Sequence, residues 1–92
     1  MRGRRNLLTK GKPAGEIQLR LYSSLGRYGG EKTGSFPVAV KSGETVGDLI
    51  RRFKIPPAEI SMVLKNDRRL AGWDVPLLPG DEVKIFGLMG GG

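Results

Sequence analysis

The chain has 92 residues, a formal net charge of +7, and neither cysteine nor histidine. This length suits one domain with one modest core, and the two missing residue types exclude disulfides, a cysteine nucleophile, thiolate metal sites and histidine general bases. No apolar run approaches the roughly 20 residues of a membrane span, and the N-terminal segment lacks the apolar stretch of a signal peptide, so we expect a cytoplasmic protein.

The positive charge is concentrated at the N-terminus. Residues 1–14 carry +5 and residues 15–92 the remaining +2 of the total of +7. Charge of a single sign together with glycine and proline favours disorder, so residues 1–15 are predicted to form a disordered basic arm. We interpret this arm as a solvated extension in preference to a segment that touches RNA or an acidic partner.

Two alternating strands are predicted first, over residues 16–22 and 36–41. Apolar residues occupy every second position, which is typical of half-buried strands, at Ile17, Leu19 and Leu21 and at Phe36, Val38 and Val40. Pro37 suits an edge strand or a strand start. The glycine-rich segment between the strands is predicted to be a loop with a short helical turn near residues 24–28. Residues 30–34 superficially resemble a phosphate loop, but the spacing fails and we expect a turn.

A single amphipathic helix is predicted to begin after Thr45. Thr45 and Asp48 are a near match to a capping box, and the apolar positions that follow have helical spacing, at Val46, Leu49, Ile50 and Phe53. Residues 55–57, Ile-Pro-Pro, are expected to end the helix. A basic cluster at its end is interpreted as compensation of the helix dipole, with a surface for an acidic partner as the alternative, at Arg51, Arg52 and Lys54.

The second half of the chain predicts two more strands. Residues 61–65 form the third strand. The sequence does not decide which of Met62, Val63 and Leu64 face inward. Residues 66–67 suggest a turn after it. Residues 68–78 are predicted to be a connection with Trp73 beneath it, followed by a turn at residues 79–81. Residues 82–86 form the last strand, with Val83 and Ile85 facing inward.

The order strand, strand, helix, strand, strand indicates an α+β fold. A long helix packed across one face of a mixed sheet is a two-layer arrangement, and the β-grasp roll is the small fold of that class. We therefore expect a β-grasp domain over residues 16–87, preceded by the basic arm and followed by a flexible glycine tail over residues 88–92.

The glycine tail is predicted to be the functional end of the molecule. Glycine loses the most entropy on ordering and adds no packing, so the tail should be mobile. It can pass through a narrow slot and present the carboxylate of Gly92. Apolar residues beside this end suggest a partner-binding surface, formed by Phe86, Leu88, Met89 and Gly90.

Two motifs and the terminus together resemble the ubiquitin-like sulfur carriers, which are the molybdopterin synthase small subunit and the thiamine-biosynthesis sulfur carrier. The motifs are Ser-Gly-Glu-Thr-Val at residues 42–46 and Leu-Pro-Gly-Asp-Glu-Val at residues 78–83, and the resemblance covers about residues 16–92. The long first loop is similar to the molybdopterin type, whereas the three terminal glycines are more similar to the thiamine type. The basic arm has no counterpart in compact members. The pathway therefore stays open.

The resemblance implies a protein co-substrate, not an enzyme on its own. An E1-like adenylyltransferase would use ATP to adenylate the carboxylate of Gly92, with Gly91 as the other half of the diglycine. A sulfur donor, either a persulfide enzyme or sulfide, would displace AMP and leave a thiocarboxylate. A sulfur-accepting synthase large subunit would use it in biosynthesis of the molybdenum cofactor or of thiamine. The resemblance implies no cofactor or metal on the chain itself and no membrane.

Two other functions remain open from the sequence. A ubiquitin-like protein modifier would pass the activated Gly92 to a lysine amine, and it needs nearly the same residues. A plain RNA- or protein-binding β-grasp module would use the basic arm for phosphate contacts. The predicted strands carry little interleaving of basic and aromatic residues that would support base stacking, so nucleic acid is the least favoured partner.

Overall fold

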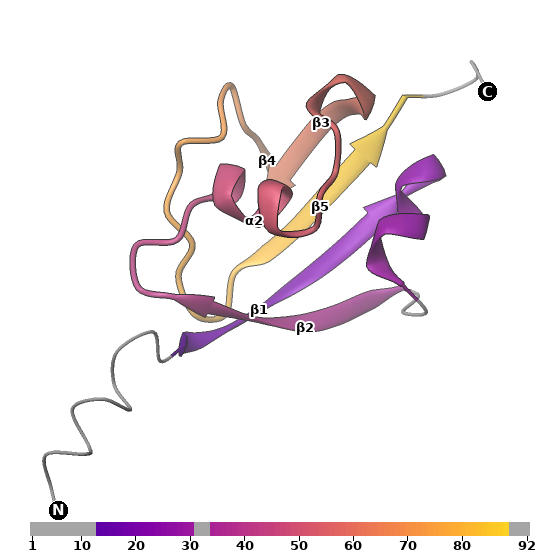
Figure 1. Ribbon diagram of the computed structural model, residues 1–92. Helices are drawn as coiled ribbons and strands as arrows, with labels where there is room; N and C mark the ends of the chain where they lie inside the picture. The colour runs from indigo at the N-terminus through magenta and orange to yellow at the C-terminus, as the bar shows by residue number, and fades with distance from the viewer. Residues whose placement is uncertain (1–12, 31–33, 89–92) are drawn as a thin grey trace, which may run out of the picture.

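The computed structural model describes residues 13–30 and 34–88. Its helices and strands, in chain order, are β1 (Pro13–Tyr22), the 3-10 helix η1 (Ser23–Gly29), β2 (Ser35–Lys41), α2 (Val46–Arg52), the 3-10 helix η2 (Pro57–Glu59), β3 (Ile60–Lys65), β4 (Arg68–Arg69) and β5 (Glu82–Gly87). Within these residues the strands form one five-stranded sheet in the order β2-β1-β5-β3-β4. β1 and β5 pair in parallel and the other pairs are antiparallel. Figure 1 shows α2 lying across one face, which confirms the α+β β-grasp architecture.

The core lies between α2 and the sheet, and the alternation in the sequence places most of it correctly. β2 buries every second residue, and β5 does the same at Val83 and Ile85. β3 buries Val63, which resolves the orientation that the sequence left open. Pro37 lies on an edge strand as expected, because β2 ends the strand order. The buried cluster is completed by residues from β1, η1, α2 and the connections, namely Ile17, Leu19, Leu25, Val46, Leu49, Ile50, Ile55 and Leu77.

The helix begins where the sequence predicts, but it is shorter than expected. Thr45 and Asp48 form the complete capping box. α2 has only seven residues and ends at Arg52, ahead of the two prolines. It ends because Lys54 takes a left-handed conformation with φ of 58°. The Lys54 N–H then donates to the carbonyl of Arg51 and the Ile55 N–H to that of Ile50, which is the Schellman pattern that closes helices.

The first strand starts earlier than the alternation predicts. β1 begins at Pro13, inside the segment assigned to the basic arm, and pairs with β2 through a register shift between Pro13 and Gly15. Gly15 packs closely on the turn before β5, since a Cβ at this position would lie 2.6 Å from the Cβ of Pro79. The glycine that favoured disorder by composition therefore has a packing role. The rest of the predicted arm, residues 1–12, lies outside the described residues.

The segment from 68 to 78 is more than a connection. Asn66 and Asp67 both have positive φ, 52° and 67°, the conformation of a tight hairpin turn. They join β3 to the two-residue strand β4. Further along, Trp73 is half-buried against the core, as the sequence suggested. Its carbonyl accepts a hydrogen bond from the N–H of Gly47 at 2.9 Å, which places it against the start of α2, a contact that the sequence did not predict.

Candidate functional site

An apolar row crosses the sheet on the face that points away from α2. Tyr22 on β1, Phe86 on β5 and Met62 on β3 are cross-strand neighbours, and all three side chains are half-buried. The rings of Tyr22 and Phe86 stack, with centroids 4.3 Å apart and planes 11° apart. Aromatic residues and methionine are enriched at protein–protein interfaces, so this aromatic row is a candidate docking surface.

Basic side chains lie directly beside the aromatic row. Arg20, Lys84 and Leu64 form the next cross-strand row, and the Arg20 guanidinium lies 5.0 Å from the ring centroid of Tyr22. The Lys84 Nζ lies 3.2 Å from Asp67 Oδ1, and this hydrogen bond and charge raise the pKa of Lys84 above its ordinary value. Arg69 on β4 is paired with Leu64 and exposed. Lys84 is thus paired locally, and it is the two arginines of this basic border that favour a partner with acidic groups around its own contact surface.

The chain leaves the sheet at the end of this same row. β5 ends at Gly87, one residue after Phe86, and Leu88 follows with 56% of its surface exposed. The Leu88 N–H donates to the carbonyl of Glu59 at 3.1 Å, so the start of the tail is held. Among the predicted site residues, the structure therefore places Phe86 and Leu88 next to one another. The others lie outside the described residues: Met89, Gly90, Gly91 and Gly92.

Tyr22 and Met62 belong to the site but were not predicted as part of it. Alternation correctly placed Tyr22 on the outward face of its strand. Tyr22 meets Phe86 only because β1 pairs in parallel with β5. This pairing joins strands that are distant in sequence, so no local sequence pattern predicts it. Met62 joins through the pairing of β3 with β5.

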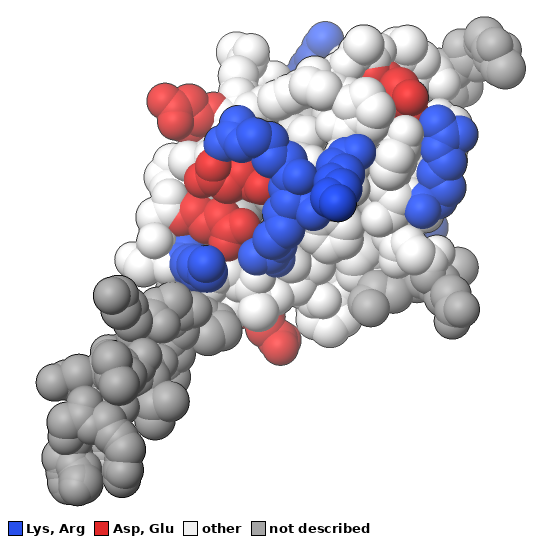
Figure 2. Space-filling view, in the orientation of Figure 1, with Lys and Arg blue, Asp and Glu red and all other residues white. Residues whose placement is uncertain are grey.

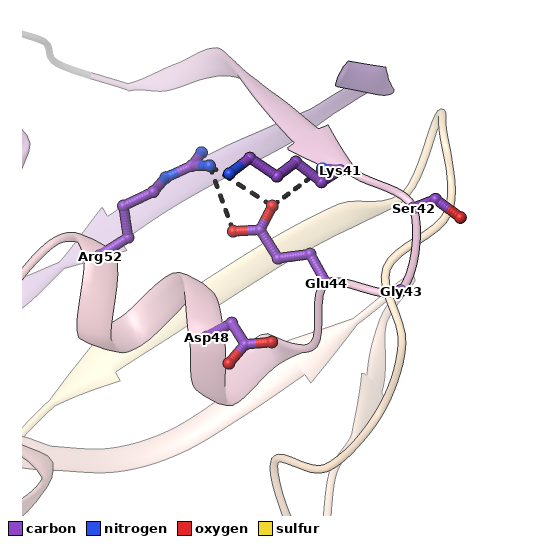
Figure 3. Close-up of a pocket in the computed structure, with 6 residues that line it drawn as sticks. All are labelled: Lys41, Ser42, Gly43, Glu44, Asp48 and Arg52. Carbon is purple, nitrogen blue, oxygen red and sulfur yellow. Dashed lines mark hydrogen bonds and ion pairs between the residues drawn. The ribbon is translucent and has the colours of Figure 1, made fainter. Parts of the chain in front are cut away.

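The opposite side of the molecule carries the basic cluster at the end of α2. Figure 2 shows basic side chains gathered around a smaller acidic group on this side. Arg51 forms an ion pair with Asp48, and the Arg52 Nη1 lies 3.2 Å from Glu44 Oε2. A hollow of about 330 Å³ lies here, with Glu44 pointing toward Arg52 (Figure 3), and is lined by Lys41, Ser42, Gly43, Glu44, Asp48 and Arg52. Because both arginines are paired with acidic side chains nearby, their charge is largely compensated within the protein. We therefore place the candidate site on the aromatic row and not on this cluster.

The described residues offer little for other kinds of site. They contain no group of three or more acidic side chains that could hold a metal ion. The same residues include no helix long and apolar enough to cross a membrane.

No protein-family model matches the chain, and no curated protein sequence does either. Solved structures do match. The solution structure of the Haloferax volcanii HVO 2177 protein has a TM-score of 0.66 and 29% identity, over 85% of this chain and 87% of that one. Small archaeal modifier protein 1 from H. volcanii has a TM-score of 0.61 and 20% identity, over 79% and 97%. A protein assigned as molybdopterin converting factor subunit 1 from Pyrococcus furiosus has a TM-score of 0.62 and 18% identity, over 79% of this chain and 97% of that one.

A further match is itself part of an assembly. It is the complex of subunits 1 and 2 of the molybdopterin-converting factor from Helicobacter pylori, with a TM-score of 0.54 and 14% identity, over 84% of this chain and 99% of the matched one. The chain is thus a small ubiquitin-like β-grasp protein. Its fold is that of the molybdopterin-type small subunits and of the small archaeal modifier proteins, which confirms the resemblance drawn from the sequence.

Proposed function

We propose that this chain is a sulfur-carrier protein whose working group is the carboxylate of Gly92. The observation that carries the proposal is the end of β5, where the strand passes through the aromatic row and continues into an exposed Leu88. A terminus that follows directly from a docking surface suits the delivery of a carboxylate to another protein's active site. The tail of glycines suits a narrow approach to that site.

The proposed chemistry has two steps. A carboxylate is a poor electrophile, so an oxygen of Gly92 first attacks the α-phosphate of ATP, the bond to pyrophosphate breaks and an acyl-adenylate forms. Hydrosulfide then attacks the acyl carbon and expels AMP, which leaves a thiocarboxylate at Gly92 and releases one proton. This route lets a chain without cysteine carry sulfur.

The proposal requires partners, since the chain acts as a co-substrate in it and ATP is used elsewhere. The activating partner would be an E1-like adenylyltransferase and the acceptor a synthase large subunit. The likeness to a protein found in a two-subunit complex supports the second of these. The aromatic row and its basic border offer the surface for such contacts. A cytoplasmic location belongs to the same proposal.

Intact-protein mass spectrometry tests this function. The chain would be incubated with ATP, sulfide and an E1-like enzyme from the same genome, then weighed. A mass gain equal to replacement of one oxygen by sulfur, mapped to Gly92, supports the carrier. A variant lacking Gly91 and Gly92 should keep the fold and show no gain. An unchanged mass of the full chain, when a known carrier is converted by its own enzyme, would reject the proposal.

A protein modifier is the second candidate, and the likeness to small archaeal modifier protein 1 favours it. It shares the adenylation step and differs only in the nucleophile, which would be a lysine amine instead of sulfur. Conjugates on a denaturing gel that disappear when Gly91 and Gly92 are deleted, without a thiocarboxylate on the free chain, would establish the modifier in place of the carrier.

A further inference from the structure

The end of β5 is fixed from the β3 side by Ser61. The pairing of β3 with β5 shifts register between Ile60 and Met62, so that Ser61 lies in a bulge. Its hydroxyl lies 3.2 Å from the carbonyl oxygen of Phe86 and 3.1 Å from that of Gly87. Bulges bend a strand and re-aim its side chains, and they are frequent beside functional sites. Here the bulge faces the last two residues of the sheet before the tail.

The same strand end is fixed from the other side by η1. Gly87 is buried, and a Cβ at this position would lie 3.0 Å from Leu25 Cγ and 3.2 Å from Ser24 Oγ. Leu25 itself is fully buried. η1 therefore packs against the backbone of β5 so closely that only glycine fits without movement.

Glu59 connects the two sides. Its carbonyl accepts the hydrogen bond from Leu88, while its carboxylate accepts one from the Tyr28 hydroxyl at 3.0 Å and one from Arg27 Nη2 at 3.1 Å. These contacts tie η2 to η1 across the point where the chain leaves the sheet. In Figure 1 the end of β5 lies between η1 and the turn that precedes β3.

We infer that Ser61 and Glu59 are positioning residues that set the direction in which the tail leaves the aromatic row. The inference rests on the proposed function of Gly92. The four residues after Leu88 span at most about 14 Å, so a partner docked on the aromatic row must hold its nucleotide within that reach. Fixing the start of so short a tail confines the carboxylate to a small volume near the nucleotide, which raises its effective concentration there.

Steady-state ATP–pyrophosphate exchange with the E1-like enzyme and full-length chains tests the inference. Ser61→Ala is expected to lower kcat about ten-fold or more, since small misplacements of a reacting group are costly. The KM for the chain should stay within about two-fold, because the docking row is unchanged. Ser61→Thr keeps the hydroxyl and should restore kcat. Ser42→Ala, an exposed serine in the turn before α2, is the matched control and should leave both constants unchanged.

A second variant covers the case in which Ser61→Ala disturbs folding. Tyr28→Phe removes the hydroxyl that binds Glu59 without touching β5, and it should lower kcat in the same selective way, though less. Unchanged kcat in both variants, or a rise in KM at constant kcat, would overturn the positioning role while leaving the carrier function intact. Wild-type chain that supports no exchange would reject the carrier function, and the inference with it.

Discussion

Asp81 is a buried carboxylate that holds together two turns distant in sequence. Only 7% of its surface is exposed. Its oxygens accept hydrogen bonds from the Leu78 N–H and the Asn66 side chain, both at 2.9 Å. Asp81→Ala should lower the free energy of unfolding by about 2 kcal/mol, because two part-buried hydrogen bonds to its charged carboxylate are lost. Urea denaturation at neutral pH measures this. The exposed Asp74→Ala should change it by less than about 0.5 kcal/mol, and an equal loss in both variants would contradict the argument.

The titration of Asp81 predicts how stability depends on pH. Burial acts to raise the pKa of Asp81, but the hydrogen bonds from Asn66 and Leu78 and the charge of Lys65 outweigh it, so the pKa lies below its ordinary value of 3.8. A lowered folded pKa gives stability that is complete above the unfolded pKa and is lost as the pH falls through the folded value. The free energy of unfolding should therefore decline below about pH 4.

A series of urea titrations from pH 7 to pH 2 checks this decline. Asp81→Asn removes the titrating group, so its curve should be flatter than that of the wild type. Asp48, whose pKa is lowered by its hydrogen bonds to Thr45 and Arg51, contributes to the slope of both proteins. Parallel curves would show that Asp81 does not contribute to the acid sensitivity.

Lys54 occupies a backbone conformation that suits glycine better. It is exposed, and its φ of 58° closes the Schellman motif at the end of α2. A left-handed conformation costs an L-residue roughly 1–2 kcal/mol, and glycine avoids this cost. Glycine also makes the unfolded chain more flexible, which offsets about 0.5–1 kcal/mol of that gain. Lys54→Gly should therefore raise the free energy of unfolding by about 0.5–1 kcal/mol. Lys54→Ala keeps the strain and is the control. A similar gain from alanine would assign the effect to loss of the charge.

At the scale of elements, the sequence predicts what local chemistry determines. Alternation places the inward residues of β1, β2 and β5, and the Thr45–Asp48 pair fixes the start of α2. The end of α2 could not be predicted, because a lysine gives no signal for a left-handed position. β4 has two residues, too few for a period, and exists only because Asn66 and Asp67 turn the chain back onto β3. The packing of Gly15 on Pro79 is likewise a tertiary contact.

The capping box predicts how much the start of α2 contributes to stability. The Thr45 hydroxyl accepts from the Asp48 N–H at 3.1 Å, and Asp48 Oδ2 accepts from the Thr45 N–H at 3.0 Å. Thr45→Ala should lower the free energy of unfolding by about 1 kcal/mol, the usual cost of a lost cap. Thr45→Ser keeps the oxygen and should stay close to the wild type in the same urea experiment. Equal losses in the two variants would place the effect in packing of the threonine methyl.

At the scale of the whole molecule, the candidate site is assembled by pairing that is distant in sequence. Phe86 and Leu88 could be singled out from the sequence because they adjoin a run of glycines, whereas the glycines of the predicted site lie outside the described residues. Tyr22 is 64 positions from Phe86 in the numbering and reaches it only through the parallel pairing of β1 with β5. The bulge at Ser61 depends on the register of β3. Such contacts form only when the whole sheet assembles, so they cannot be predicted from the sequence of any single segment.

In the proposed function, docking on the aromatic row is separate from chemistry at Gly92, and the two should respond to different changes. Phe86→Ala removes the ring stacked on Tyr22, so the KM for the chain with the proposed E1-like enzyme should rise about ten-fold, as for a central aromatic contact worth roughly 1.4 kcal/mol. The kcat should change little, because the carboxylate and its tail are intact. Pyrophosphate exchange at several chain concentrations gives both constants.

Leu78→Ala is the matched control for this docking prediction. Leu78 is 60% exposed, comparable with Leu88, but it precedes the start of β5 whereas Phe86 lies near the end of that strand. Its KM should equal that of the wild type. An unchanged KM in Phe86→Ala, or the same rise in both variants, would move the partner surface away from the aromatic row. The tail would then have to reach its partner from a different face of the sheet, within the same short span of glycines.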